Sequence, residues 1–215
     1  MKGAELRLGI LASHGGTNLQ AIMDACSRGR LDASVAVVIS NNSSSKAIQR
    51  ARAVSIPAYH ISGVHPQPPR EDGAIRDALQ KHHVDLVVLT GYMKLLGPKT
   101  LAGYRNRVLN SHPALLPGFG GKGMYGTQVH EEVLKAGDKV TGVTIHLVDD
   151  QYDHGAAVAQ CTVPVLPDDT AAVLEERVKV RERRFWVEVI QKIAHCEINL
   201  DALADSSLKA TGEVR

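Results

Sequence analysis

Short apolar runs alternate with longer amphipathic segments along the first half of the chain. The apolar runs are rich in valine, isoleucine and leucine and lack strict alternation, which is typical of strands buried on both faces. They predict strands at 6–12, 34–40, 58–61, 85–90 and 107–111. Apolar positions at helical spacing predict helices at 19–27, 46–54 and 70–82. This order predicts an α/β fold with a mostly parallel sheet, helices on both faces, and ligands at the carboxyl ends of the strands.

The pattern changes after residue 140. Residues 141–148 alternate between apolar and polar, and a second run at 156–163 follows a polar turn at 149–155, which predicts an antiparallel hairpin extending the sheet. An amphipathic segment at 170–195 predicts a long closing helix. Residues 202–215 are small and polar, and we expect this tail to fray. The simplest organisation is a single domain over 1–201.

Composition and charge narrow the class of protein. Hydrophobic residues make up 44% of the chain, enough for a sizeable core. Basic and acidic residues nearly balance, with a net charge of +2, so we expect neither a nucleic-acid nor a membrane partner. No apolar run approaches the roughly 18 residues of a membrane span, and the start of the chain is interpreted as a core strand, not a signal peptide. Three widely spaced cysteines without a CxxC pair favour a cytoplasmic protein.

The first candidate site is the turn SHGGTN at 13–18, between the first predicted strand and helix. Glycines let backbone N–H groups approach a ligand, and the helix N-terminus adds partial positive charge. Thr17 and Asn18 could cap the helix, bind an anion, or do both. An ordinary tight turn before a capped helix fits the residues equally well.

The second candidate site is the segment NSHPALLP at 110–117. Asn110 and His112 are two positions apart, so in an extended chain their side chains point to the same side. An amide that stabilises an oxyanion beside an imidazole that moves protons suits acyl transfer. A histidine satisfied by local backbone hydrogen bonds is the alternative. A third segment, DDQYDHG at 149–155, is either a solvated turn or the source of a carboxylate partner for His112.

Other segments match the sequence motifs of known sites but lack the structural context that those sites require. The segment GKGMYG at 121–126 matches G-x-G-x-x-G, but it follows a proline-containing loop and not a strand. Lys122 is followed by glycine, so a phosphate P-loop is not expected either. His130 lacks the second histidine of a zinc-protease helix, and no histidine pairs with a cysteine at metal-ligand spacing. We therefore expect no catalytic metal.

Taken together, these segments resemble the glycinamide ribonucleotide transformylase family of purine biosynthesis, from about residue 6 to residue 165. The resemblance is strongest in NSHPALLPGF and the downstream TGVTIHLVDDQYDHG. GGTNLQAI is similar to the family's phosphate loop, and GKGMYG to a loop variant found in part of the family. The resemblance implies a seven-stranded, mostly parallel sheet. It also implies transfer of a formyl group from 10-formyltetrahydrofolate to the amine of glycinamide ribonucleotide.

The resemblance assigns roles to individual residues. The family's catalytic residues fall on Asn110, His112 and Asp153. By resemblance, Asn110 donates to the oxyanion, His112 moves protons or stabilises charge, and Asp153 orients His112 or relays protons through water. The ribonucleotide-binding positions, including those for its phosphate, fall on Gly16, Thr17, Asn18 and Glu182.

The folate-binding positions of the family fall mainly on the segment after the strand predicted at 85–90. They are Arg70, Met93, Lys94, Leu95, Leu96, Val148 and Asp149. Lys94 stands where the family often has arginine, which would remove a planar bidentate contact. The last helix keeps Glu182 but surrounds it with arginines, and it matches the family most loosely.

Several related activities share the Asn-His-Asp centre. Formyltetrahydrofolate deformylase is expected to carry an extra N-terminal domain, and methionyl-tRNA formyltransferase an extra C-terminal domain. A sugar-nucleotide formyltransferase is disfavoured by the GGTN turn. From other classes, the chain could be a catalytically silent ligand-binding relative, or a nicotinamide-dependent oxidoreductase on the strength of GKGMYG alone. We expect small-molecule partners only, and a monomer or homodimer.

Overall fold

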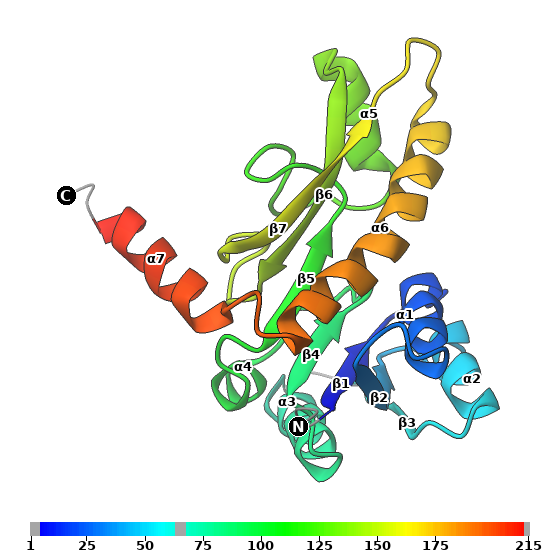
Figure 1. Cartoon of the computed structure of the whole chain (residues 1–215), viewed down its shortest axis with the longest axis vertical. Helices are drawn as coiled ribbons and strands as arrows, with labels where there is room; N and C mark the ends of the chain where they lie inside the picture. The colour runs from blue at the N-terminus through cyan, green and yellow to red at the C-terminus, as the bar shows by residue number, and fades with distance from the viewer. Residues whose placement is uncertain (1–4, 63–67, 213–215) are drawn as a thin grey trace.

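The structure is a computed structural model that describes residues 5–62 and 68–212, with side chains at 5–62 and 71–206. The described residues form one seven-stranded sheet in the order β3-β2-β1-β4-β5-β6-β7 (Figure 1). The strands are β1 (Leu6–Leu11), β2 (Ala33–Ser40), β3 (Ala58–His60), β4 (Leu86–Leu89), β5 (Val108–His112), β6 (Val140–Leu147) and β7 (Ala157–Pro164). The helices are α1 (Thr17–Ser27), α2 (Lys46–Ala53), α3 (Pro68–Lys81), α4 (Pro98–Gly103), α5 (Thr127–Ala136), α6 (Ala171–Ala194) and α7 (Leu200–Gly212).

Strand direction divides the sheet into two parts. The strands from β3 to β5 pair in parallel, joined by crossover segments that contain helices. β6 pairs antiparallel with β5, and β7 pairs antiparallel with β6. The predicted α/β fold, with a mostly parallel sheet and an antiparallel hairpin after residue 140, is therefore confirmed.

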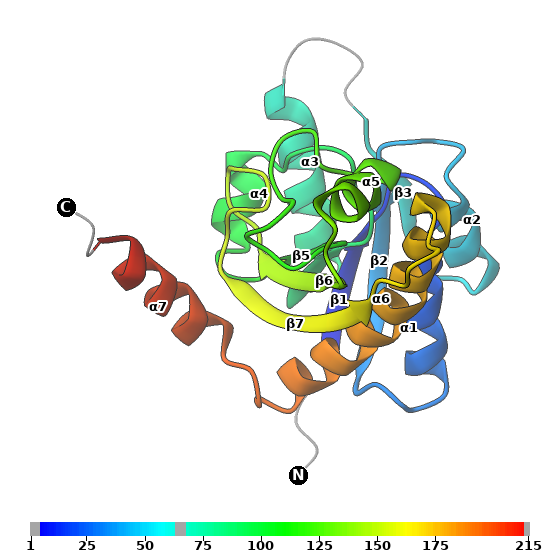
Figure 2. The same ribbon diagram turned by 90° about the horizontal axis from the view of Figure 1, so that it is seen from above.

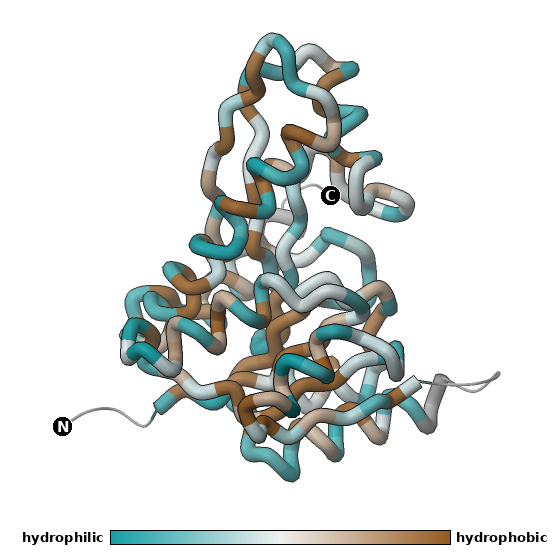
Figure 3. The backbone as a smooth tube through the Cα atoms, turned by 90° about the vertical axis from the view of Figure 1, so that its right-hand side faces the viewer, coloured by the Kyte–Doolittle hydropathy of each residue, from teal (hydrophilic) through white to brown (hydrophobic). Residues whose placement is uncertain are grey.

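Each face of the sheet carries its own hydrophobic core. Successive strand residues point to opposite faces, so Leu8 and Ile10 of β1 join one cluster while Leu11 joins the other. Helices α1, α2 and α6 cover the first face, and α3 and α4 cover the second (Figure 2). The hydropathy colouring of Figure 3 shows the apolar strand segments gathered inside the molecule. Burial on both faces explains why these strands have continuous apolar sequences.

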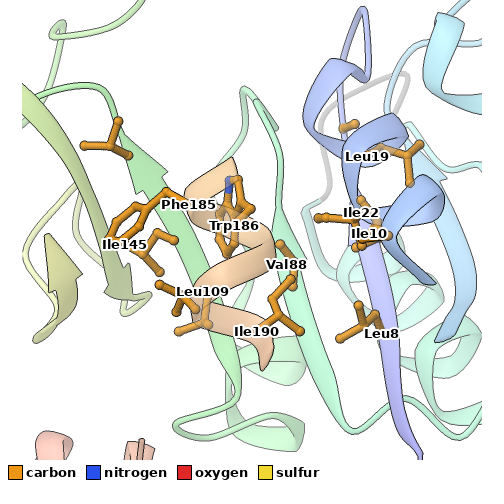
Figure 4. Packing of buried hydrophobic residues seen from close by; sticks show 14 of the residues in the cluster. Leu8, Ile10, Leu19, Ile22, Val88, Leu109, Ile145, Phe185, Trp186 and Ile190 are labelled. Atoms are coloured by element: carbon orange, nitrogen blue, oxygen red, sulfur yellow. The ribbon is translucent and has the colours of Figure 1, made fainter. Parts of the chain in front are cut away.

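The long helix α6 fastens the hairpin to the rest of the sheet. Its N-cap residue is Thr170, whose Oγ1 accepts a hydrogen bond from the Val173 N–H at 3.3 Å. Its aromatic residues Phe185 and Trp186 lie beside strand residues of β5 and β6 in Figure 4. Trp186 is fully buried, and burial of a large apolar side chain contributes roughly 2–3 kcal/mol. Within the described ranges, no helix combines the length and apolar character needed to cross a bilayer.

Two helices, α4 and α5, lie where the hydropathy pattern predicted none. α4 has only six residues, too few for a helical period to show, and it begins at Pro98. Its first turn is capped from α3, because the buried Asp72 carboxylate accepts the N–H groups of Lys99 at 2.7 Å and Thr100 at 2.9 Å. α5 follows the glycine-rich loop that contains GKGMYG. Its buried residues are Val129, His130 and Val133.

The tail at 202–215 was expected to fray, and the structure has a helix, α7, over Leu200–Gly212, which the apolar pattern did not predict. The Asn199 side chain accepts the N–H groups of Asp201 and of the residue after it, both at 3.1 Å. Arg107 also binds the Asp201 carboxylate with two nitrogens, at 2.9 and 2.7 Å. A local cap and a long-range ion pair therefore stabilise the first turn of α7. The helix projects away from the sheet and its covering helices in Figure 1.

Replacing Asp72 by alanine should lower the free energy of unfolding by about 2 kcal/mol. The two N–H groups of α4 and the Thr100 hydroxyl would lose a charged acceptor in a buried position. Denaturation in urea measures the loss. Asp77→Ala is the matched control, because that carboxylate is 64% exposed and pairs with Arg76 on the surface. It should change the free energy by less than about 0.5 kcal/mol, and equal losses in both variants would contradict the capping role.

Candidate active site

Three side chains predicted to be catalytic come together at the carboxyl end of β5. Asn110 and His112 lie on β5, on the side of the sheet where Val108 joins the second core. Asp153 lies in the turn between β6 and β7, and its Oδ2 is 3.3 Å from His112 Nδ1. His112 is only 3% exposed. The carboxylate cluster at 149–155 thus supplies a partner for His112, which one of the two sequence interpretations predicted.

The structure adds His146, a residue that the sequence analysis missed. The antiparallel register of β5 and β6 sets it directly opposite Asn110. Its Nδ1 donates to the Leu147 carbonyl at 2.8 Å, and its Nε2 lies 3.2 Å from Asn110 Nδ2 and 3.5 Å from Asp153 Oδ1. In its neutral form, Nε2 accepts one N–H of the Asn110 amide and so orients it. An amide has two N–H donors, which leaves one for a ligand.

The loop between β5 and α5 closes around this centre with its backbone. His112 Nε2 donates to the Phe119 carbonyl at 2.6 Å, and the Gly121 N–H donates to Asp153 Oδ2 at 3.0 Å. Phe119 and Gly121 have φ values of 55° and 97°, in the region that favours glycine. The segment GKGMYG therefore begins with a glycine whose N–H binds a carboxylate of the protein itself.

Both ring nitrogens of His112 face oxygen atoms. The Phe119 carbonyl oxygen accepts a hydrogen bond from the Nε2–H group, while a carboxylate oxygen of Asp153 faces Nδ1. A neutral imidazole carries a single N–H, so only the doubly protonated ring donates to both oxygens. That doubly protonated form would place a buried positive charge on the same side of β5 as the Asn110 amide.

Asp153 is held in its ionised form. Burial alone would raise the pKa of its carboxyl, but the hydrogen bond and the charge of His112 and the Gly121 N–H outweigh burial and hold the pKa well below its ordinary value of 3.8. The ionised carboxylate therefore faces the imidazole of His112 in a buried site, where an unpaired charge would be costly.

A second polar cluster lies on the opposite side of β5. Ser111, between the two predicted catalytic residues, donates its hydroxyl to Glu182 Oε1 at 2.5 Å and accepts the Trp186 Nε1–H at 3.1 Å. The Asn18 side chain also hydrogen-bonds Glu182. Burial raises the pKa of Glu182 above its ordinary value of 4.5, because these hydrogen bonds and the cations of α6 do not fully offset the desolvation. Glu182 thus links β5 to the first turn of α1.

The glycine turn after β1 leads into α1 without a side-chain cap. Gly16 is the N-cap residue with φ 63°, and no side-chain hydrogen bond caps the helix. Thr17 is exposed, and Asn18 Oδ1 is buried without a hydrogen-bond partner in the described structure. The first N–H groups of a helix have no intrahelical acceptor, so those of α1 are available to a ligand.

The segment predicted to contact the folate lies beside the same turn. Met93 N–H donates to Ser13 Oγ at 2.8 Å, which ties the residues after β4 to the end of β1. Met93 and Leu95 are each 46% exposed, whereas Leu96 is buried in the second core. The two exposed side chains offer an apolar surface next to the polar ends of the strands.

The remaining predicted folate residues are more scattered. Lys94 forms an ion pair of 3.1 Å with a glutamate of α3. The Val148 N–H bonds to a carbonyl of β5 at 2.9 Å, and Asp149 pairs with His154 at 2.7 Å and not with the catalytic centre. Arg70 lies in the first turn of α3, and its side chain is outside the described residues. Among residues 5–62 and 68–212, no three His, Cys, Asp or Glu side chains are grouped to hold a metal ion.

The fold and the site define a class of protein. An amide donor, an imidazole and an ionised carboxylate meet at a strand end of a doubly wound sheet, an arrangement that can polarise a carbonyl group. The chain belongs to the formyl transferase family, whose model matches residues 6–190.

Named relatives within this family resemble the chain over most of its length. The phosphoribosylglycinamide formyltransferase of Mycobacterium tuberculosis is 40% identical over 192 residues, which cover 89% of this chain and 86% of the relative. The chloroplastic phosphoribosylglycinamide formyltransferase of Arabidopsis thaliana is 39% identical over 89% of this chain, but the chain spans only 65% of that relative. The crystal structure of glycinamide ribonucleotide transformylase 1 from Symbiobacterium toebii matches with a TM-score of 0.83 and 40% identity. The match covers 90% of this chain and 89% of that one.

Replacing Glu182 by glutamine should stabilise the fold near neutral pH. Below the ordinary pKa of 4.5 the carboxyl is protonated in both the folded and unfolded states, so the substitution gains little there. As the pH rises through the raised folded pKa, the native protein bears the cost of a desolvated charge, and the advantage of glutamine grows. Unfolding in urea between about pH 4 and pH 8 measures this trend.

Glu188→Gln is the matched control for Glu182→Gln, because Glu188 is 49% exposed and pairs with Arg181 at 2.8 Å on the same helix. This control variant should not become more stable relative to the native protein as the pH rises. A constant difference for Glu182→Gln over the whole range would contradict the effect of burial.

Proposed function

We propose that this chain transfers the formyl group of 10-formyltetrahydrofolate to the amine of 5'-phosphoribosylglycinamide, a one-carbon transfer of de novo purine biosynthesis. The observation that carries the proposal is the meeting of Asn110, His112 and Asp153 in one buried centre. Membership of the formyl transferase family supports it, as do relatives about 40% identical that are named for this activity.

The reaction needs stabilisation of an oxygen that becomes negative. As the neutral amine attacks the formyl carbon, charge moves onto the formyl oxygen. The second N–H of the Asn110 amide, oriented by His146, donates a hydrogen bond to that oxygen. The charged ring of His112 on the same side of β5 adds a favourable field at low dielectric. Both groups are fixed before the substrates arrive, so little reorganisation is required.

Asp153 keeps His112 in its active form. Its carboxylate is ionised and faces His112 Nδ1, while the Phe119 carbonyl holds Nε2. The ring is therefore held in position by both of its nitrogens. As the new C–N bond forms, the amine must lose a proton and the departing folate nitrogen must gain one. Asp153 and His112 lie where a proton can be relayed between them, directly or through water.

The two substrates approach β5 from different sides. The ribonucleotide phosphate would bind Gly16, Thr17 and Asn18 at the start of α1, with Glu182 close by on the α6 side of the sheet. The folate would lie against the apolar side chains of Met93 and Leu95. The other folate positions are Arg70, Lys94, Leu96, Val148 and Asp149. The end of β5 then lies between the amine and the formyl group.

The experiment follows release of the folate product from 10-formyltetrahydrofolate, with and without glycinamide ribonucleotide. Turnover that depends on the amine supports the proposal. Hydrolysis of the folate without the amine would identify a deformylase instead. Binding of a folate or ribonucleotide with no turnover would identify a catalytically silent relative.

Replacing Asn110 by alanine should lower kcat by roughly 100- to 1000-fold, because an oxyanion donor is lost from a preorganised site. Steady-state kinetics with both substrates measures the loss, and circular dichroism verifies that the variant is folded. Gln49→Ala, an exposed amide side chain on α2, serves as the control and should retain full activity. Near-normal kcat in a folded Asn110→Ala variant would rule out this role.

A further inference from the structure

The turn between β1 and α1 is held from outside by the beginning of α2. The Ser45 hydroxyl and the Ala47 N–H both donate to the His14 carbonyl, at 3.0 and 3.2 Å. Arg50 Nε donates to the Gly15 carbonyl at 3.0 Å. The two carbonyl groups that precede Gly16 are therefore both bound by donors of one neighbouring segment.

Close packing fixes the same turn against α2. A Cβ atom on Gly16 would lie 3.0 Å from both Cα and Cβ of Ala47, and Ala47 is fully buried. Gly16 also has φ 63°, a conformation that favours glycine. The turn thus has no room to move toward α2, and its carbonyl groups are locked by hydrogen bonds.

The direction of these carbonyl groups matters for an anion. A peptide group that presents its N–H attracts a phosphate, while one that presents its C=O repels it. A flip of the peptide after His14 or Gly15 would move a partially negative oxygen toward the start of α1. The hydrogen bonds from Ser45 and Arg50 oppose such a flip.

We propose that Ser45 and Arg50 are positioning residues for the phosphate of the ribonucleotide. They hold the carbonyl groups of His14 and Gly15 on the α2 side, so that the N–H groups at the start of α1 face the anion. This inference deepens the proposed function and rests on it for the identity of the ligand. Neither residue is required to touch the reacting atoms.

The positive charge of Arg50 also favours an anion at the start of α1. Its second hydrogen bond runs from Nη1 to Gln20 Oε1 in the first turns of α1, at 2.9 Å. Among the described residues, both hydrogen-bond acceptors of Arg50 are neutral, a backbone carbonyl and an amide oxygen. Its positive charge therefore adds to the field at the helix N-terminus, and partial burial reduces screening by salt.

The test compares Ser45→Ala and Arg50→Gln with the native protein in formyl transfer. Each variant should raise KM for glycinamide ribonucleotide by about tenfold, the effect of losing one charge-assisted hydrogen bond between the turn and the phosphate. Both should leave kcat and KM for the folate within about twofold of the native values. Inorganic phosphate should also compete less well with the ribonucleotide in both variants. Arg52→Gln, an exposed arginine on the same helix, is the matched control and should change none of these values.

Unchanged KM for the ribonucleotide in Arg50→Gln would overturn the inference. A lower kcat together with higher KM values for both substrates would also overturn it, because such changes would indicate a general structural effect, which thermal unfolding would reveal.

Calorimetric titration with the ribonucleotide separates this inference from the proposed function. If the native protein binds the ribonucleotide but transfers no formyl group, the function fails. Weaker binding by Ser45→Ala and Arg50→Gln would then still support the positioning role, and unchanged binding would refute it.

Discussion

The site depends on the interactions of the Asp153 carboxylate. This carboxylate lies in the turn between β6 and β7 and contacts His112 of β5, His146 of β6 and the N–H of Gly121. Two strands and two loops are thus fixed relative to one another by a single ionised group. Such a buried charge is tolerated only because its partners are all in place, so the site forms together with the fold around it.

The strand β5 separates two chemical environments within three residues. Its alternate residues contact a charged centre on one side, while Ser111 joins Glu182 on the other. One carboxyl is held ionised by hydrogen bonds and a neighbouring cation, and the other has its pKa raised by burial. The pleat of a single strand therefore places two carboxyl groups with nearly the same intrinsic pKa in environments that shift their pKa values in opposite directions.

Local signals in the sequence predicted most of the fold and part of the site. Buried strands were predicted because parallel strands covered on both faces have continuous apolar sequences, and the two-residue spacing of Asn110 and His112 put them on one side. His146 was missed because its place opposite Asn110 depends on the register of β5 and β6, which the apolar pattern does not contain. The helix α7 was missed for a similar reason, since the Arg107 that binds its first turn is distant in sequence.

The hydrogen bond from Trp186 to Ser111 has a practical consequence. Trp186 is the only tryptophan in the chain, and its indole N–H binds the same hydroxyl that binds Glu182. Any ligand that rearranges this carboxylate changes the electrostatic environment of the indole ring. The intrinsic fluorescence of the protein therefore comes chiefly from an indole that is linked through the Ser111 hydroxyl to Glu182, a residue proposed to bind the ribonucleotide. A change in this fluorescence on addition of the ribonucleotide would report on the proposed site without a label and without turnover.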